Sequence, residues 1–179
     1  MCNQLLAGFD IGTSKIRCFI YNLVGDLKFS SSHPTPFIAG GDGFSYNPAE
    51  HLWSVSKLVF RECVEYSKKN NLQIISLAVS SVGESGIAID KDKEILFDAI
   101  PWYDQRTEII RDEFEKKTSA TEIYNNTGLN SDHIFGAYKL LWIKKYKPDI
   151  FNKIFKWLPI SDFIAWKFSG RIATDYSQA

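Results

Sequence analysis

The stretch of sequence that decides the fold is Gly8-Phe9-Asp10-Ile11-Gly12-Thr13-Ser14-Lys15-Ile16-Arg17. An apolar run over residues 5–11 ends in a turn of one glycine and two hydroxyl residues, and a second run of β-forming residues follows over 16–23. This pattern predicts two strands joined by a tight turn. Glycine lets backbone amides approach an anion closely, while hydroxyl and basic side chains add donors and positive charge. The candidate phosphate-binding residues are Gly12, Thr13, Ser14, Lys15 and Arg17.

The acidic residue in this stretch, Asp10, narrows the choice of ligand. Its carboxylate would repel a bare phosphate, so it makes sense mainly as a ligand of a Mg²⁺ ion that bridges it to the phosphate. Two other phosphate loops fit poorly, because the GxxxxGK[ST] loop is absent and a GxGxxG fingerprint opens a helix, whereas a strand follows here. A plain hairpin turn that carries an aspartate is the alternative interpretation.

The segments after this turn alternate between β-rich and helical patterns. A helix begins at Asn47-Pro48-Ala49-Glu50, where the asparagine can cap, the proline suits the first helical position and the glutamate completes a capping box. That helix ends at Asn70-Asn71. Strands with interspersed helices indicate the α/β class. The remaining elements expected are strands over 28–32 and 74–80 (the second buried), a hairpin of strands 87–90 and 95–97, and helices over 105–126, 132–146 (capped by Ser131) and 161–169 (capped by Ser161 and ended by Gly170).

The composition is that of an ordinary globular protein. Of the 179 residues, 45% are hydrophobic and 23% are charged, and 21 basic side chains balance 21 acidic ones. The length suits a single domain. A net charge of zero lacks the basic footprint of proteins that bind nucleic acid or anionic lipid, so we expect neither nucleic acid nor a membrane as a partner.

The cysteines and the chain start indicate a compartment. Cys2, Cys18 and Cys63 show no CxxC spacing, which argues against a disulfide framework or a zinc site and fits a reducing environment. No stretch approaches the about 20 apolar residues of a membrane span, and the first residues carry no positively charged leader region. The expected location is the cytoplasm.

A second polar cluster, Ser80-Ser81-Val82-Gly83-Glu84-Ser85-Gly86, follows the strand expected over 74–80. Ligands of α/β proteins gather at the carboxyl ends of strands, where glycine permits a close approach. Glu84 can accept hydrogen bonds there from the hydroxyls of a polar substrate. A solvated loop carboxylate fits the same residues equally well.

A third cluster, Ile100-Pro101-Trp102-Tyr103-Asp104-Gln105-Arg106, sets an aromatic platform beside polar side chains. Such a set suits a sugar, because the ring stacks on CH groups while the polar side chains bind hydroxyls. In the alternative interpretation Asp104 caps the following helix and Arg106 forms a surface ion pair, and the two roles can coexist. No metal-ligand spacing links the three histidines, His33, His51 and His133.

Taken in order, these clusters resemble the N-terminal domain of the FGGY carbohydrate kinases, the family of glycerol kinase, xylulokinase and gluconokinase. FDIGTSKIR resembles the phosphate-binding opening D-x-G-T-S/T-x-x-R of the family. VGESGIAIDKDKEILFDAIPWYDQRT resembles its NQRET…D…AIVWqDrRT or GQMHG…LD…ILWnDqR stretch, and TGL, KLLWIKKYKPDIF and ISDFIAWKFSGRIATDYSQA resemble later landmarks. The resemblance runs from about Leu5 to Ala179.

The resemblance implies an actin-like ATPase (ribonuclease H-like) fold, with a mixed central sheet and flanking helices. It also implies ATP-dependent phosphorylation of a hydroxyl of a sugar or polyol, with ATP and Mg²⁺ as cofactors. Asp10 would hold the metal directly or through water, and Gly12, Thr13, Ser14 and Arg17 would lie near the γ-phosphate. The substrate-binding positions that it implies are Gly83, Glu84, Trp102, Asp104 and Arg106.

Two departures from the family pattern bear on the substrate. Gly83 stands where glycerol kinases have the arginine of an Arg-Glu pair, and Ile134, beside His133, stands where a tyrosine contacts glycerol. Glu84 matches the glutamate of that pair, whereas xylulokinases have a histidine there. The space left by the missing arginine favours a longer polyol or ketose over glycerol.

The resemblance further implies that residues 1–179 are an incomplete N-terminal sugar-binding domain. In the family the general-base aspartate and the adenosine-holding domain follow the segment that ends here at Ala179, so we expect the isolated chain to be an inactive fragment. Two rival hypotheses stay open: a sugar sensor that transfers no phosphate, and an interaction scaffold. An open sheet edge and exposed apolar surface would favour a homo-oligomer of the isolated chain.

Overall fold

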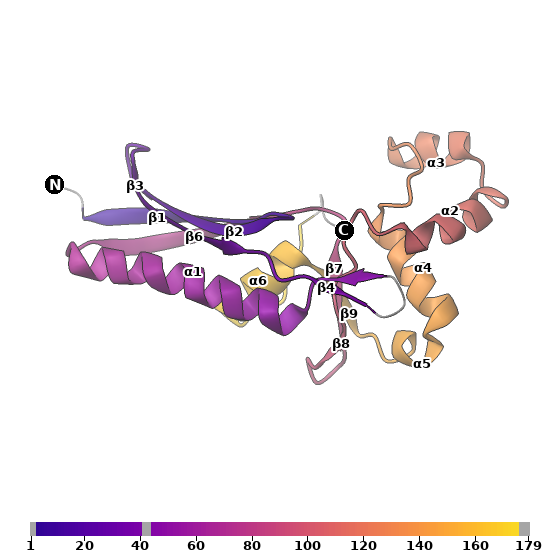
Figure 1. Ribbon diagram of the computed structural model, residues 1–179. Coiled ribbons are helices and arrows are strands. Elements are labelled where there is room, and N and C mark those ends of the chain that lie inside the picture. Colours follow the sequence, from indigo (N-terminus) through magenta and orange to yellow (C-terminus); the bar gives the residue numbers. More distant parts are fainter. Residues whose placement is uncertain (1–2, 41–43, 176–179) are drawn as a thin grey trace.

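The computed structural model describes residues 3–40 and 44–175, whose arrangement is shown in Figure 1. The strands are β1 (Gln4–Ile11), β2 (Lys15–Asn22), β3 (Leu27–Pro34), β4 (Ile38–Ala39), β5 (Ser45–Tyr46), β6 (Gln73–Ser81), β7 (Gly86–Ile89), β8 (Ile95–Phe97) and β9 (Lys156–Pro159). The helices are α1 (Ala49–Lys69), α2 (Glu108–Glu115), α3 (Ala120–Thr127), α4 (Gly136–Tyr146), α5 (Pro148–Phe151) and α6 (Ile160–Ser169), together with the 3-10 turn η1 (Gln105–Thr107).

The largest sheet has the strand order β3-β2-β1-β6. β1 runs antiparallel to β2 and parallel to β6, so the mixed central sheet is confirmed. Alternate residues of β1 are buried, and Phe9 and Ile11 belong to this buried set. The same alternation leaves Asp10 on the other, half-exposed side, one residue before the strand ends. Asp10 is therefore accessible at the carboxyl end of β1, while the residues on either side of it pack into the core.

Helix α1 lies along one face of this sheet, as Figure 1 shows, and contacts β2, β3 and β6. Its buried stripe includes Leu52, Val59 and Cys63, which lie on one face of the helix. The helix ends at Asn70, and Asn71 adopts a left-handed conformation with φ 55°, as its residue type allows.

The start of α1 differs from the expected capping box. Pro48 takes the N-cap position, and the amide of Ala49 donates to Asp98 Oδ1 at 2.9 Å. Asn47 instead forms a β-bridge with Ala99, and its Nδ2 donates to the carbonyl of Pro36 at 2.9 Å. The cap thus comes from a residue 49 positions away, which no local pattern reveals.

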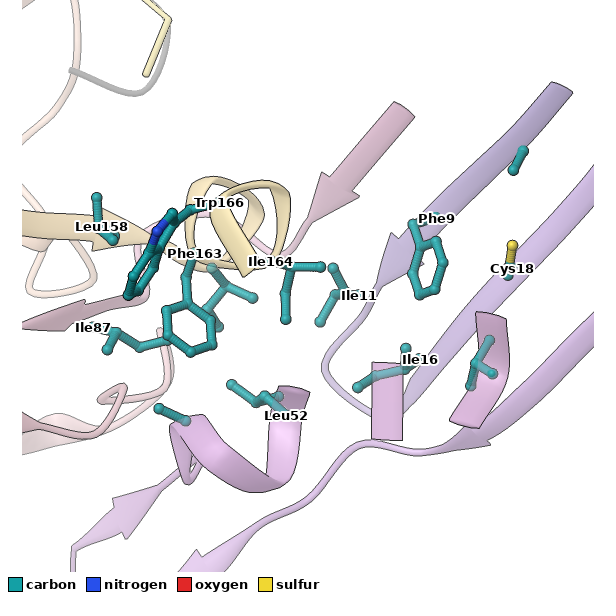
Figure 2. Packing of buried hydrophobic residues seen from close by; sticks show 14 of the residues in the cluster. Phe9, Ile11, Ile16, Cys18, Leu52, Ile87, Leu158, Phe163, Ile164 and Trp166 are labelled. Carbon is teal, nitrogen blue, oxygen red and sulfur yellow. The ribbon is translucent and has the colours of Figure 1, made fainter. Parts of the chain in front are cut away.

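Helix α6 joins the large sheet to a second one. It packs against β6, β7 and β9, and Figure 2 shows Phe163 and Ile164 directed toward Ile11 and Leu52. One continuous apolar cluster therefore spans the main sheet, α1 and α6. Burial of that cluster is the main favourable contribution to folding here.

The second sheet has the order β8-β7-β9 and is antiparallel throughout. Its β7–β8 hairpin confirms the expectation, but β9 was not expected, because its four residues are too few to show a period. Gly86 allows β7 and β9 to approach closely, since a Cβ there would overlap the ring of Trp157. This contact fixes the start of β7, where the polar cluster that contains Glu84 ends.

Helices α2 to α5 lie beyond the carboxyl end of β1, at the right of Figure 1. The single helix expected over 105–126 is wrong, because the chain forms η1, α2 and α3 in its place. Ser119 Oγ accepts a hydrogen bond from the amide of Glu122 at 3.2 Å and starts α3, which Gly128 ends in the left-handed conformation. A serine followed by a glutamate three residues later is a start signal that the longer apolar pattern obscured.

Two other expected helix starts are also wrong. α4 begins at Gly136 rather than 132, and Ser131 does not cap it, because its Oγ pairs with Tyr138 Oη at 2.9 Å. α6 begins at Ile160, and Ser161 uses its backbone amide to bind Ser81 Oγ at 3.1 Å. Neither serine side chain therefore caps the start of its helix.

The strand expected to be buried over 74–80 is instead the edge strand β6. None of its nine residues is fully buried, and within the described part of the chain only β1 pairs with it. Its apolar residues thus reflect partial cover by α1 and α6 rather than a central place in the sheet.

The described residues bear on two other expectations. None of their helices has the length and apolar character needed to cross a membrane. Cys18 and Cys63 are buried and not joined by a disulfide, and Cys2 lies outside the described residues.

Candidate functional site

The β1–β2 turn forms the first wall of the site. The amide of Gly12 donates to the carbonyl of Lys15 at 2.9 Å, and a Cβ on Gly12 would lie only 3.2 Å from that oxygen. Thr35 Oγ1 donates to the carbonyl of Gly12 at 2.7 Å and fixes the turn from outside. The side chains of Thr13, Ser14 and Lys15 are exposed, which leaves a narrow turn whose donors face solvent.

Asp10 and Arg17 form an ion pair across the two strands. They are directly opposed in the β1–β2 register, and Arg17 Nη1 donates to Asp10 Oδ2 at 2.8 Å. The Arg17 side chain is 40% exposed and the Asp10 side chain is 41% exposed, so solvent and ligands reach both. The described residues contain no cluster of three or more metal-ligating side chains. Mg²⁺ often takes only one or two carboxylates and keeps waters and phosphate oxygens, so a single exposed carboxylate fits that ion.

Trp102 connects this turn to the third polar cluster. Its Nε1 donates to Thr13 Oγ1 at 3.1 Å, although the two residues are 89 positions apart. The indole keeps 40% of its surface and lies edge-on to Tyr103. A cavity of about 10 Å³, room for about one water, is lined by both Thr13 and Trp102. The phosphate-type turn and the aromatic platform therefore touch each other directly.

Glu84 stands at the end of β6 in an unusual backbone conformation. Its φ is 59°, in the left-handed region that non-glycine residues rarely adopt. Its exposed side chain reaches the start of α4, where Oε2 accepts a hydrogen bond from the amide of Gly136 at 2.7 Å. A carboxylate is favourable at a helix N-terminus. A Cβ on the neighbouring Gly83 would meet nothing within 4 Å, so the space beside Glu84 is open.

Asp104 and Arg106 form a second ion pair, and this one is buried. Arg106 donates from Nε to Asp104 Oδ1 and from Nη2 to Oδ2, both at 2.8 Å, and the arginine and aspartate side chains are 0% and 3% exposed. The amides of Ser45 and Arg106 add further hydrogen bonds to the same carboxylate. Asp104 caps η1 in this way, so the capping role expected of it is confirmed, while the surface location expected for the Arg106 ion pair is wrong.

Aromatic rings surround the guanidinium of Arg106. Its central carbon lies 4.2 Å from the ring centre of Phe44, 4.5 Å from that of Tyr46 and 5.0 Å from that of Trp142. Burial alone would raise the pKa of Asp104, but the hydrogen bonds from Arg106 and Ser45 outweigh it and hold the pKa below its usual value. The pair is therefore ionised and neutralises itself inside the protein.

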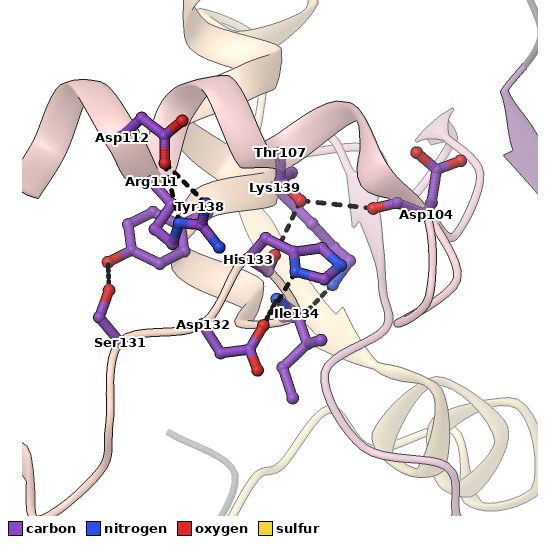
Figure 3. A network of polar contacts seen from close by, with 10 residues as sticks. All are labelled: Asp104, Thr107, Arg111, Asp112, Ser131, Asp132, His133, Ile134, Tyr138 and Lys139. Carbon is purple, nitrogen blue, oxygen red and sulfur yellow. Dashed lines mark hydrogen bonds and ion pairs between the residues drawn. The ribbon is translucent and has the colours of Figure 1, made fainter.

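A network behind these residues was not anticipated from the sequence. Figure 3 shows it around the loop 131–135, which leads into α4. Thr107 Oγ1 donates to the carbonyl of His133 at 2.7 Å, and Lys139 Nζ donates to the carbonyl of Ile134. Lys139 is fully buried. The sequence signal for it was a lysine on the aromatic and aliphatic face of the helix, apart from the two lysines of its last turn.

The predicted site residues fall into two sets. Asp10, Thr13, Arg17, Glu84 and Trp102 present side chains at the strand ends, and Gly12 and Gly83 leave space beside them. Asp104 and Arg106 lie buried against each other. Direct contact of any of these residues with a ligand stays a prediction.

Comparison with known proteins gives a consistent family. The N-terminal domain model of the FGGY family of carbohydrate kinases matches residues 5–179. Among curated relatives, the L-fuculokinase of Escherichia coli (strain K12) is 26% identical over 183 residues, which cover 100% of this chain and 38% of that protein. The chain thus spans little more than a third of the length of this relative.

Solved structures support the same fold. The gluconate kinase of Lactobacillus acidophilus is 25% identical and superposes with a TM-score of 0.89, over 98% of this chain and 35% of that one. The glycerol kinase of Plasmodium falciparum, solved with ADP, superposes with a TM-score of 0.84 over 93% of this chain and 34% of the kinase chain. Because the two sequences are only 20% identical, this likeness shows the fold alone. The actin-like ATPase fold is therefore confirmed, and the chain belongs to the FGGY family of carbohydrate kinases.

Proposed function

We propose that this chain is the sugar-binding part of a kinase that transfers the γ-phosphate of ATP to a hydroxyl of a sugar or polyol. The observation that carries the proposal is the hydrogen bond from Trp102 to Thr13, because it joins an anion-binding turn to an aromatic platform. A phosphate donor on the turn and a sugar on the platform would then be neighbours. Proximity and orientation account for much of the catalysis in phosphoryl transfer.

On the phosphate side, the β1–β2 turn supplies the polar groups. Asp10 would hold Mg²⁺, which neutralises phosphate charge as the reaction proceeds. Thr13 and Ser14 offer hydroxyl donors, and Arg17 and Lys15 offer positive charge within the same turn. Because Arg17 is already paired with Asp10 at 2.8 Å, the approach of a cation to Asp10 would release its guanidinium toward the phosphate.

On the substrate side, Trp102 and Glu84 are the residues that we propose to touch the sugar. The exposed indole suits the CH face of a sugar, and the exposed carboxylate of Glu84 suits its hydroxyls. Asp104 and Arg106 would support this wall from behind, since their mutual hydrogen bonds hold the segment that carries Trp102.

The substrate class that we propose is a polyol or ketose longer than glycerol. The open space at Gly83 supports this choice, because a side chain there would otherwise fill the region beside Glu84. Glycerol, gluconate, xylulose and fuculose form a panel of different chain lengths and chemistries. We expect the longer members to bind better than glycerol.

The test measures sugar binding and ATP turnover with each member of that panel. It uses the protein in the form that its gene encodes. We expect saturable sugar binding and sugar-dependent release of ADP from MgATP. Glu84→Ala should weaken sugar binding by about 1–3 kcal/mol, the typical cost of a lost buried hydrogen bond, while Glu94→Ala on the β7–β8 hairpin serves as the matched control. Sugar binding that ignores MgATP and yields no ADP would instead identify a sensor.

We also propose that the isolated 179-residue chain transfers no phosphate. Its described residues offer carboxylates for the metal and for the substrate, and the proposal assigns none of them as the general base for the attacking hydroxyl. Sugar-dependent ATP turnover by the purified chain, well above the rate without sugar, would refute this.

A further inference from the structure

Lys139 is a buried cation that neither the phosphate turn nor the proposed substrate contacts use. Its residue is 0% exposed, and it lies on the first turn of α4, three positions after Gly136. A lysine ammonium carries three donors, and burying it is costly unless opposite charge and acceptors surround it. The groups around it should therefore explain why it is there.

The backbone of the loop 131–135 is held by buried side chains from two directions. Lys139 Nζ donates to the carbonyl of Ile134, and Thr107 Oγ1 donates to the adjacent carbonyl of His133. The imidazole of His133 is held in turn by Asp132, with 2.9 Å between Nδ1 and Oδ1 (Figure 3). This loop ends at Gly136, whose amide binds Glu84, so its position sets where the carboxylate of Glu84 rests.

Charge around Lys139 comes from three elements. Glu84 at the end of β6 and Asp104 before η1 attract its ammonium, whereas Arg106 on η1 repels it. His133 directly precedes Ile134, whose carbonyl accepts the hydrogen bond from Lys139. Asp104 is already neutralised by Arg106. Glu84 is therefore the carboxylate whose charge Lys139 is left to balance.

From this arrangement we infer that Lys139 is a positioning residue for the substrate wall, fixing the carbonyl of Ile134 and holding the carboxylate of Glu84 toward the sugar. The inference rests on the proposed function and adds to it a residue that never touches the sugar. Burial, which outweighs the attraction of Glu84 and Asp104, lowers the pKa of Lys139 to about 8. The charge that holds Glu84 is thus present at neutral pH and lost in mild alkali.

The experiment is a double-mutant cycle with sugar affinity as the readout. Lys139→Met keeps an unbranched side chain, one heavy atom shorter, and removes the charge, and Lys144→Met, on the exposed side of the same helix, is the matched control. The probe is whichever of glycerol, gluconate, xylulose and fuculose binds the unmodified protein most tightly. We expect Lys139→Met to raise the Kd roughly tenfold, to leave it unchanged in a Glu84→Gln background, and Lys144→Met to have no effect.

A second measurement needs no variant and guards against misfolding of Lys139→Met. The affinity of the unmodified protein should fall as pH rises from 7 to 9.5, with a midpoint near 8, because the neutral amine no longer attracts Glu84. Any variant that remains folded without the lysine should lose this pH dependence.

The outcomes separate the two proposals. A protein that binds no member of the panel overturns the proposed function and this inference with it. A protein that binds sugar with an affinity independent of pH overturns the inference alone. The inference is also overturned if Lys139→Met lowers the sugar affinity by the same factor in the unmodified protein and in the Glu84→Gln background. The lysine would then act on stability alone.

Discussion

Two of the aspartate–arginine pairs among the described residues share the same nitrogen–oxygen distance, 2.8 Å, but their surroundings differ completely. Asp10 and Arg17 face each other at the end of an open sheet with about 40% of each side chain exposed. The side chains of Asp104 and Arg106 are at most 3% exposed, and aromatic rings enclose the guanidinium. Distance alone says nothing about role.

Solvent access decides what each pair can do. The exposed pair sits in a high dielectric, contributes little to stability, and can exchange its partner for a ligand. The buried pair is desolvated and is stabilised by the hydrogen bonds between its two side chains, so separating them costs much free energy. The first is suited to chemistry and the second to holding Trp102 in place.

The largest expected effect comes from breaking the buried pair. Arg106→Gln should lower the free energy of unfolding by about 3–5 kcal/mol, because it leaves the carboxylate of Asp104 buried without its counter-charge. Urea unfolding followed by circular dichroism measures this. The matched variant Arg17→Gln should cost far less, and similar losses in both would refute the distinction.

Removing the exposed acid should damage turnover and spare stability. We expect Asp10→Asn to lower kcat by about 100-fold or more in the protein as its gene encodes it, because metal-bound charge matters most in the transition state. The melting temperature should stay within a few degrees of the unmodified value. An unchanged kcat would remove Asp10 from the mechanism.

The contribution of the buried pair to folding stability should depend on pH in the acid range. The pKa of Asp104 is depressed in the folded protein, so its contribution is present at neutral pH and is lost as pH falls through the folded-state value. The double variant Asp104→Leu with Arg106→Met should therefore lose less stability between pH 5 and about pH 3 than the unmodified protein. The comparison needs urea titrations at several pH values, and parallel curves would contradict it.

Salt should affect only the exposed pair, and weakly. We expect Arg17→Gln to cost at most about 1 kcal/mol at low ionic strength and nothing measurable near 1 M salt, where screening acts over about 3 Å. The loss caused by Arg106→Gln should hardly change over the same range. A salt-sensitive Arg106 effect would mean that solvent reaches the buried pair.

The parts of the fold that the sequence predicted correctly are those with a local physical cause. The strands β1 and β2, the end of α1 at Asn70 and the glycine that ends α6 all follow from neighbouring residues. The errors occurred where the partner is distant. The cap of α1 comes from Asp98, and the amide of Ser161 binds Ser81, 80 positions away. Ser131 pairs with the Tyr138 side chain on α4 instead of capping a backbone amide of that helix.

The candidate site divides in the same way. Sequence alone identified an acid before a glycine turn, a glutamate after a strand and an aromatic platform, because residue type and spacing carry that chemistry. Only the tertiary structure brought Trp102 to Thr13, set Glu84 on the start of α4 and buried Lys139 beneath the loop. Residue type fixes which bonds a side chain can form, but burial and the distant partners that packing supplies determine which of those bonds exist.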